Sequence, residues 1–339
     1  MKRKSNYTVA VMGATGAVGE EMIKILEERK FPIAQLKLLA SARSKGKKYR
    51  FHGREVVVEE LTKDSFHGVD IVLASAGGSI SKQFAPYAVK AGAVVVDNTS
   101  FYRMDPKVPL VVPEINAGDI KKHNGIIANP NCCTIIMLMP LWPIHKAYGI
   151  KRIIVSTYQS ASGAGAKAMK ELEDQAREVL AGKSATKKVF PHQIAFNLFS
   201  HNSAIKEGGY NDEELKIIQE THKIFHAPQI RVAPTCVRVP VFRAHSESIT
   251  LELKKKPDLK KIRALLSKAP GVRVVDDVNK NHFPMPIEAT GKDDVLVGRI
   301  RKDLSNNKGV CLFVAGDQLR KGAALNAVQI AEILIQPKA

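Results

Sequence analysis

Cysteine is scarce in this sequence, and long hydrophobic runs are missing. The four cysteines, Cys132, Cys133, Cys236 and Cys311, show no repeated CxxC spacing. This argues against a disulfide scaffold or a zinc finger, and it fits a reducing compartment. The apolar segment 7–12 is too short for the core of a signal peptide, and no segment is long enough to span a membrane. We therefore expect a cytoplasmic protein with no membrane partner and no bound metal.

Acidic residues are also few, with 33 Asp and Glu against 52 Lys and Arg, so the net charge is +19. With a charge of this size, nucleic-acid binding has to be considered as an alternative function. The basic clusters at 45–48 and 254–256, however, lack the interleaved aromatic residues of a surface on which bases stack. We interpret the charge as solvated basic surface that also serves anionic small molecules, and we expect no nucleic-acid partner.

A glycine-rich segment follows the first predicted strand, 7–12, and precedes a helical pattern over 20–28. The order strand, glycine turn, helix is typical of a dinucleotide site, because glycines let the backbone approach a pyrophosphate at a helix N-terminus. The spacing here is GxxGxxG rather than the more familiar GxGxxG. The predicted cofactor-binding residues in this turn are Gly13, Ala14, Thr15, Gly16, Ala17, Val18 and Gly19.

The second predicted strand, 36–40, ends without the acidic residue that NAD-binding proteins present to the ribose 2′-hydroxyl. Ser41, Arg43 and Ser44 follow it instead. A guanidinium and two hydroxyls suit a 2′-phosphate, and no carboxylate is there to repel it. NADP(H) is therefore expected rather than NAD, with a solvated basic turn as the alternative.

Two more short apolar strands are predicted at 70–75 and 93–97, with a helix at 81–91 between them. This alternation predicts a Rossmann-type doubly wound parallel sheet with right-handed crossovers. Gly77 follows the first of these strands. Ligands of such sheets collect at the carboxyl ends of the strands, so Gly77 is expected at the cofactor cleft. Arg103 lies a few residues beyond the second strand, where anion binding and a plain surface position are both open.

Cys132 is a candidate reactive thiol, because it falls at or near a predicted helix N-terminus. Pro130 ends the preceding strand, so a helix can begin only after it. At a helix start the dipole and the free amide groups lower a thiol pKa and offer donors to an oxyanion. The alternative is that Cys132 and Cys133 are simply a buried apolar pair.

The second half of the chain has no further glycine-rich nucleotide turn, and its mixed pattern predicts an α+β domain. Strands are expected at 150–158, 230–237, 246–253, 272–275, 295–301 and 310–315, and helices at 164–181, 212–224 and 259–267. The segment 182–211 is polar and loop-like, and His192 and His201 in it match no metal motif. We interpret it as a surface or interface excursion.

Segments spread from residue 9 to about 332 resemble the bacterial-type aspartate-semialdehyde dehydrogenase family. They are 9–19, 40–44, 95–103, 129–134, 156–159, 236–240, 244–247, 297–303 and 321–324. The resemblance implies NADPH-dependent reductive dephosphorylation of 4-phospho-L-aspartate to L-aspartate 4-semialdehyde through a cysteine thioacyl intermediate. That reaction serves lysine, methionine, threonine and diaminopimelate biosynthesis. The alternative is N-acetyl-gamma-glutamyl-phosphate reductase, which shares the fold plan and a cysteine nucleophile.

The resemblance also assigns catalytic roles. Cys132 matches the nucleophile, and Cys133 stands where the family motif usually has serine. His245 matches the acid/base residue, a role that histidine fills in many enzymes. Asn131 resembles the oxyanion donor, and Gln159 the residue that orients the intermediate or a water.

For the substrate, Arg238 matches the carboxylate clamp and Glu213 the partner of the ammonium group. Lys216 and Arg103 match the phosphate-binding residues. The i, i+3 spacing puts Glu213 and Lys216 on one helical face, where an exposed ion pair is the alternative. Arg238 and Glu213 favour a free amino acid over an acetylated one.

The resemblance extends to the remaining contacts and to the domains. Ser160, Ser162 and Gly163 are expected near the nicotinamide, and Asn326 lies in the segment that returns to the nucleotide domain. The expected domains are an NADP-binding domain, 1–132, rejoined by the C-terminal helix, 319–339, and a catalytic and dimerisation domain, 133–318. The expected partners are the small-molecule substrate and a second copy of the chain, as a homodimer or a dimer of dimers.

Overall fold

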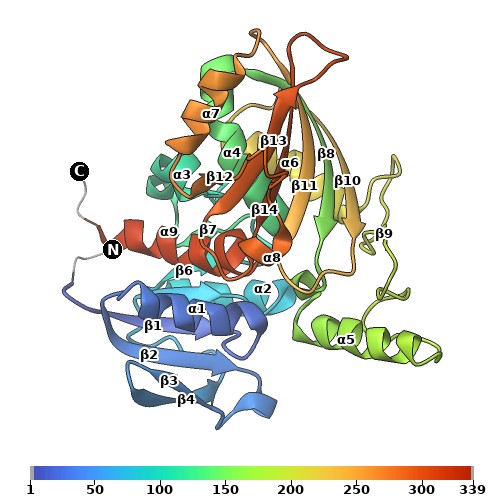
Figure 1. Ribbon diagram of the computed structural model, residues 1–339. Helices are drawn as coiled ribbons and strands as arrows, with labels where there is room; N and C mark the ends of the chain where they lie inside the picture. Colours follow the sequence, from blue (N-terminus) through green and yellow to red (C-terminus); the bar gives the residue numbers. More distant parts are fainter. Residues whose placement is uncertain (1–3, 337–339) are drawn as a thin grey trace. The chain divides into compact units, whose positions relative to one another are not determined.

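The computed structural model describes residues 4–336, which form two compact units (Figure 1). The first unit runs to Asn131 and takes up the chain again from Ala323, and the second is Cys132–Gly322. Residues 1–3 and 337–339 of the expected NADP-binding domain lie outside the described residues.

The first unit contains a seven-stranded sheet in the order β3-β4-β2-β1-β5-β6-β7. All neighbouring strands from β4 to β7 pair in parallel, and β3 is antiparallel to β4. The predicted Rossmann-type sheet is therefore confirmed, but the β3–β4 hairpin was not predicted. The strands are β1 Tyr7–Met12, β2 Ile33–Ala40, β3 Lys48–Phe51, β4 Arg54–Glu60, β5 Ile71–Ala74, β6 Val94–Asp97 and β7 Ile126–Ala128.

Helices cover both faces of this sheet. Side chains alternate along β1, so Val9 and Val11 join the core under α1 and α9, and Ala10 and Met12 join the core under α2. Figure 1 shows α1 and α9, from the two ends of the chain, side by side. The helical segments are α1 Ala17–Glu28, η1 Ala42–Ser44, α2 Gly78–Lys90, α3 Pro113–Asn116, η2 Ala117–Lys122 and α9 Leu325–Ile335.

The second unit is the expected α+β domain, built on a mixed seven-stranded sheet in the order β12-β13-β14-β11-β8-β10-β9. Helices α4, α6 and α7 pack on the sheet, and α4 contacts its four central members β8, β11, β14 and β13. The strands are β8 Ile150–Gln159, β9 Phe199–Ser200, β10 Arg231–Arg238, β11 His245–Leu253, β12 Val272–Val274, β13 Val295–Lys302 and β14 Gly309–Gly316. The helical segments are α4 Cys132–Tyr148, η3 Ala161–Ala164, α5 Ala166–Leu180, α6 Asp212–Phe225, α7 Leu259–Ser267, α8 Pro286–Ala289 and the π-helical turn Arg320–Ala324.

The segment 182–211 is not only a surface excursion. Phe190, Ile194 and Ala195 are buried and form a small apolar core with Leu172 of α5. These apolar residues follow neither helix nor strand spacing, so the sequence pattern gave no sign of their burial. The surface interpretation is therefore wrong for this part of the segment.

Helix α4 is apolar along most of its length and largely buried, as a core helix is expected to be. Within residues 4–336, no helix has the length and apolar character needed to cross a membrane.

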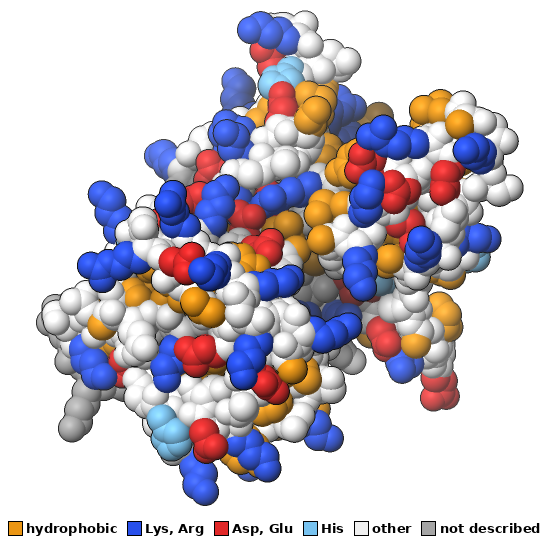
Figure 2. Space-filling view, turned by 90° about the horizontal axis from the view of Figure 1, so that it is seen from below, with side chains coloured by type: hydrophobic (Ala, Val, Ile, Leu, Met, Phe, Trp, Pro, Cys, Tyr) orange, Lys and Arg blue, Asp and Glu red, His pale blue; other side chains and the backbone are white. Residues whose placement is uncertain are grey.

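The basic residues are spread out on the face drawn in Figure 2. Lys and Arg side chains lie there singly or in small groups, with acidic and apolar side chains between them. This distribution agrees, for that face, with the interpretation of the net charge of +19 as dispersed basic surface.

Candidate active site

Strand register brings three of the predicted site residues together. Arg238 of β10 pairs with Gln159 of β8, and both are the last residues of their strands. The neighbouring β11 runs antiparallel to β8 and starts at His245, next to the Ser246–Tyr158 pair. The three polar side chains therefore lie at neighbouring ends of the strands β10, β8 and β11, although they are far apart in the sequence.

Cys132 is the first residue of α4, as predicted from Pro130. It is partly buried, whereas Cys133 is fully buried. The backbone of Gly322 lies against it, because a Cβ at that position would be only 3.0 Å from the Cβ of Cys132. Asn131, which precedes the helix, is also buried.

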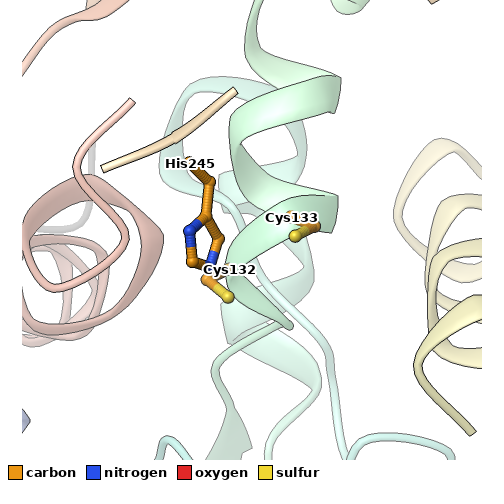
Figure 3. A group of neighbouring side chains, drawn as sticks. All are labelled: Cys132, Cys133 and His245. Atoms are coloured by element: carbon orange, nitrogen blue, oxygen red, sulfur yellow. The ribbon is translucent and has the colours of Figure 1, made fainter. Parts of the chain in front are cut away.

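The two thiols lie close to His245. The sulfur atoms of Cys132 and Cys133 and a ring nitrogen of His245 are all within 4.8 Å of one another. Figure 3 shows one ring nitrogen of His245 turned toward Cys132 and the other turned away. A thiol beside an imidazole is the arrangement that nucleophilic cysteine catalysis needs.

The surroundings of the two thiols differ. The hydrogen bond with the Cys133 thiol, with a further contribution from His245, lowers the pKa of Cys132 well below its usual range. Burial, together with the same hydrogen bond, raises the pKa of Cys133 well above its usual range. Because the thiolate is the reactive form, this difference supports Cys132 as the nucleophile.

Glu247, two residues beyond His245 on the same face of β11, is fully buried. Neither of its carboxyl oxygens has a hydrogen-bond partner among the described residues. Burial, and after it the proximity of Cys132, raises the pKa of Glu247 well above its usual range. The raised pKa of Glu247 disfavours a second negative charge near the Cys132 thiolate.

The guanidinium of Arg238 is fixed on two sides. Its Nη1 donates to the backbone oxygen of Ser160 at 2.9 Å, and its Nη2 donates to Nε2 of His201 at 2.7 Å. Burial lowers the pKa of His201 to about 4, so this imidazole is neutral and can accept the bond. The Nε–H of Arg238 has no partner among the described residues. No motif pointed to a role for His201, which lies in the irregular segment before α6.

Glu213 lies on the first turn of α6, whose start is fixed by a capping box. Its carboxylate accepts hydrogen bonds from Nε2 of Gln159 at 3.2 Å and from Nζ of Lys216 at 2.9 Å. The Thr157 hydroxyl donates to Oε1 of Gln159 at 3.0 Å, which fixes the orientation of the Gln159 amide. The predicted pair of Glu213 and Lys216 is present, with Glu213 only 5% exposed.

The turn 160–163 packs against His245 and Arg238. A Cβ on Gly163 would lie 3.1 Å from Cε1 of His245 and 3.2 Å from Nη1 of Arg238. The absence of a side chain at Gly163 therefore allows the turn to approach both residues. The predicted contacts of Ser160, Ser162 and Gly163 with a nicotinamide remain predictions.

In the first unit, the glycine turn has the geometry that a dinucleotide requires. Gly13 has φ 90°, and a Cβ there would lie 2.6 Å from the backbone oxygen of Ser75. A Cβ on Gly19 would overlap the backbone oxygen of Gly13. Gly16 is the N-cap of α1 and has no side chain to block the amide groups that follow. The turn therefore fits a pyrophosphate at the helix start.

The second predicted cofactor turn adjoins the first. The hydroxyl of Thr15 lies 3.3 Å from that of Ser44. Ser41 and Arg43 are exposed. Gly77, with φ 95°, is the N-cap of α2.

Arg103 is held by a folded loop after β6. Asp97 is fully buried and accepts hydrogen bonds from the Ser81 hydroxyl at 2.7 Å and the Thr99 amide at 2.9 Å. Arg103 donates to the backbone oxygen of Asn98 at 2.9 Å. This bond fixes the Nη2 end of the Arg103 guanidinium within this unit.

Asn326 is fully buried in α9. Its amide donates to the backbone oxygen of Val111 at 2.9 Å and to Oδ1 of Asn129 at 2.7 Å. These bonds describe a structural role, and its predicted contact with the cofactor remains a prediction.

Known proteins resemble this chain over nearly its full length. A family model described as "Semialdehyde dehydrogenase, NAD binding domain" matches residues 8–123, and one described as "Semialdehyde dehydrogenase, dimerisation domain" matches residues 141–321. The aspartate-semialdehyde dehydrogenase of Synechocystis sp. is 56% identical over 98% of each chain. That of Bacillus subtilis is 51% identical over 96% of each chain.

Solved structures agree with these relatives. Aspartate semialdehyde dehydrogenase II from Vibrio cholerae is 48% identical, with a TM-score of 0.95 over 97% of this chain and 98% of the other. A second structure of that protein, described as complexed with ASA, is 47% identical with the same TM-score, over 98% of this chain and 99% of the other. The extent of these matches and the site geometry lead to one conclusion. The chain belongs to the aspartate-semialdehyde dehydrogenase family.

Proposed function

We propose that this protein carries out nicotinamide-dependent reductive dephosphorylation of 4-phospho-L-aspartate to L-aspartate 4-semialdehyde. The observation that supports this proposal most directly is the position of the Cys132 thiol. Cys132 is the first residue of α4, and its sulfur lies within 4.8 Å of a ring nitrogen of His245. The curated relatives bear the name of this activity, and one related structure holds ASA. The reaction belongs to lysine, threonine, methionine and diaminopimelate biosynthesis.

An acetylated glutamyl substrate is not favoured. Its nitrogen carries no positive charge, so it would leave the buried carboxylate of Glu213 without a cationic partner on the ligand. The relatives are also named for aspartate semialdehyde rather than for the acetylated compound.

The Cys132 thiolate starts the reaction by attacking the C4 carbonyl of the substrate. The new bond joins sulfur to C4, and the phosphate leaves with the electron pair of its bond to C4, which gives a thioacyl enzyme. A bound cofactor would supply the hydride that C4 accepts. The C4–sulfur bond then breaks, which releases the aldehyde and returns Cys132 to its thiolate form. His245, through the nitrogen turned toward Cys132, moves protons to and from the sulfur and the substrate oxygen. The Asn131 amide stabilises the oxyanion, and Gln159 orients the intermediate.

The substrate carries three charged groups, and each has a proposed partner. Arg238 binds the carboxylate, supported by the buried Nε–H that has no partner among the described residues, beside its two anchored nitrogens. Glu213 binds the ammonium group. Lys216 binds the phosphate, a role that the family resemblance gives to Arg103 as well. This division gives every charge on the substrate an opposite charge on the protein.

The activity is tested by a phosphate-dependent assay on the purified protein. Aspartate semialdehyde and inorganic phosphate are supplied, and formation of the reduced cofactor is followed with NADP⁺ and NAD⁺ in parallel. We expect turnover that requires both aspartate semialdehyde and phosphate. Activity with N-acetylglutamate semialdehyde alone would overturn the proposal.

The preferred cofactor is proposed to be NADP(H), bound by the first unit along the 13–19 and 41–44 turns. Arg43 and the two neighbouring serines suit the 2′-phosphate. Changing Arg43 to Asp should lower kcat/KM for NADP⁺ by roughly ten- to a hundredfold, because an ionic hydrogen bond is replaced by repulsion. Steady-state kinetics with both cofactors measures this.

Arg50→Asp is the matched control for that charge change. Arg50 is an exposed arginine on β3 of the same unit, and its replacement should leave the ratio of NADP⁺ to NAD⁺ efficiency unchanged. An unchanged ratio in Arg43→Asp itself would remove the support for this cofactor assignment.

The second unit is proposed to form a homodimer, or a dimer of dimers, through the exposed face of its sheet. Ile154 and Tyr158 on β8 are 42% and 36% exposed, and the ring of Tyr158 lies 6.2 Å from that of Phe313 on β14. A strand face with exposed large apolar residues is typical of an interface. The matching family model is described as a dimerisation domain.

Tyr158→Glu should shift the protein toward monomer, because it places a charge on this face beside the exposed apolar residues. Light scattering after size-exclusion chromatography measures the mass. Val278→Glu, at a 70% exposed position outside the strands of the sheet, is the control and should keep the wild-type mass. A Tyr158→Glu protein of wild-type mass would place the interface elsewhere.

We also propose the cytoplasm as location, since the four free cysteines need a reducing compartment.

A further inference from the structure

Three buried polar side chains form a hydrogen-bonded chain that ends at His245. Gln318, Ser162, Ser160 and His245 are all at most 2% exposed. Nε2 of Gln318 donates to Oγ of Ser162, the two serine hydroxyls are 3.0 Å apart, and Oγ of Ser160 lies 3.0 Å from Nδ1 of His245. All four residues lie within the second unit.

The backbone amide of Ala244 gives this chain a direction. It donates to Oε1 of Gln318 at 2.8 Å, so the amide NH₂ group of Gln318 must face Ser162. A hydroxyl has one hydrogen to donate. With Gln318 donating to it, Ser162 has its own hydrogen available to donate to Ser160, and Ser160 then has its hydrogen available to donate to Nδ1 of His245. The backbone N–H of Ser160 points to the same nitrogen at 3.1 Å.

Nδ1 of His245 thus receives two donors, so it must offer a lone pair. In a neutral imidazole the single proton then sits on Nε2. Nε2 has no hydrogen-bond partner among the described residues, and Nδ1 is the nitrogen held against Ser160, so Nε2 is the one turned toward Cys132 in Figure 3.

We propose that Gln318, Ser162 and Ser160 are positioning residues that set the His245 tautomer with its proton on Nε2, facing the reacting atoms. The inference rests on the proposed function only for the catalytic use of that proton. The tautomer itself is a property of the free protein.

Gln318→Glu should reverse the direction of donation along this series of hydrogen bonds, and the two side chains have almost the same shape. A carboxylate has no hydrogen to donate, so it accepts from both Ala244 and Ser162. Ser162 then accepts from Ser160, and Oγ of Ser160 becomes an acceptor for a proton on Nδ1 of His245. The proton should move from Nε2 to Nδ1 in most molecules, although the backbone N–H of Ser160 still points to Nδ1 and opposes the change.

The test is NMR of the full-length protein labelled with ¹⁵N in its histidines, without substrate or cofactor. The sequence contains ten histidines, and the His245 signals are identified by their absence in His245→Asn. In the wild type, at a pH where the ring is neutral, Nε2 should show the shift of a protonated nitrogen and Nδ1 that of a lone-pair nitrogen. A proton on Nδ1 in the wild type overturns the proposal without any variant.

Ser162→Ala separates the relay from a long-range effect of charge. Ser162→Ala removes the hydroxyl that links Gln318 to Ser160. The double variant Ser162→Ala/Gln318→Glu should therefore show the same His245 ¹⁵N shifts as Ser162→Ala alone. If Gln318→Glu changes the shifts equally with and without Ser162, or not at all in the wild-type background, the relay is refuted.

Kinetics give the second measurement. Gln318→Glu should lower kcat by roughly ten- to a hundredfold, within the range of general acid–base effects, with the KM for aspartate semialdehyde changed less than about twofold. The spectra are recorded without turnover, so a failed relay and a failed dehydrogenase assay are distinguishable.

Discussion

Replacing Cys132 with alanine abolishes phosphate-dependent oxidation of aspartate semialdehyde, whereas replacing Cys133 with serine retains most of it. Loss of the nucleophile should cost on the order of 10⁴-fold or more in kcat. Serine at position 133 still donates a hydrogen bond to the Cys132 sulfur, so the thiolate is preserved. Steady-state rates of the two purified variants decide between the thiols. Turnover in Cys132→Ala, or its absence in Cys133→Ser, would contradict the assignment.

The same pair of thiols predicts a pH dependence. Because the pKa of Cys132 is lowered, its thiolate is present at a lower pH than that of a free cysteine and is lost only as the pH falls through the lowered value. Cys133→Ala removes the hydrogen bond that contributes most to this shift. The pH midpoint of iodoacetamide alkylation at Cys132 should therefore move upward in Cys133→Ala and remain low in Cys133→Ser.

Arg238→Lys should lower kcat/KM for aspartate semialdehyde by roughly 10²- to 10³-fold, mostly through KM. The guanidinium reaches Ser160 and His201 at the same time and still presents Nε–H to a carboxylate. An ammonium group cannot make these contacts from one position, since it lacks the planar fork. Steady-state kinetics with aspartate semialdehyde as the varied substrate measures the change.

Arg231→Lys on the same strand is the control for Arg238→Lys. Arg231 is exposed at the far end of β10, and its Nη2 lies 3.3 Å from a carboxylate oxygen of Glu252. Surface ion pairs contribute little, so this variant should stay within about twofold of the wild type. A wild-type KM in Arg238→Lys would remove Arg238 from the substrate carboxylate.

The regular part of the fold follows from local patterns. The buried parallel strands are short, apolar and β-branched, and the helices between them have an apolar face, so the Rossmann-type sheet could be predicted. The hairpin of β3 and β4 could not. Its strands are mostly exposed and charged, with only Phe51 and Val58 buried, and they lie at the edge of the sheet.

The site residues also fall into two groups, those that local sequence or a motif predicts and those whose role depends on tertiary packing. The thiol at a helix start could be predicted from Pro130, and the motif resemblance supplied Gln159, Arg238 and His245. His201 and Gln318 were not predicted, because each acts through a hydrogen bond that only tertiary packing creates. The sequence does not specify the orientation of an amide or the direction of a hydroxyl, and these depend on the neighbours that folding brings together.

Helix α9 has a consequence for the order in which the protein is completed during synthesis. It packs beside α1 in the core of the first unit, yet it contains some of the last residues of the chain. Residues 132–322 of the second unit are contiguous and leave the ribosome as a block, whereas the first unit lacks one of its covering helices until residues 325–335 have followed. The half of the protein that is made first is therefore the half that finishes folding last.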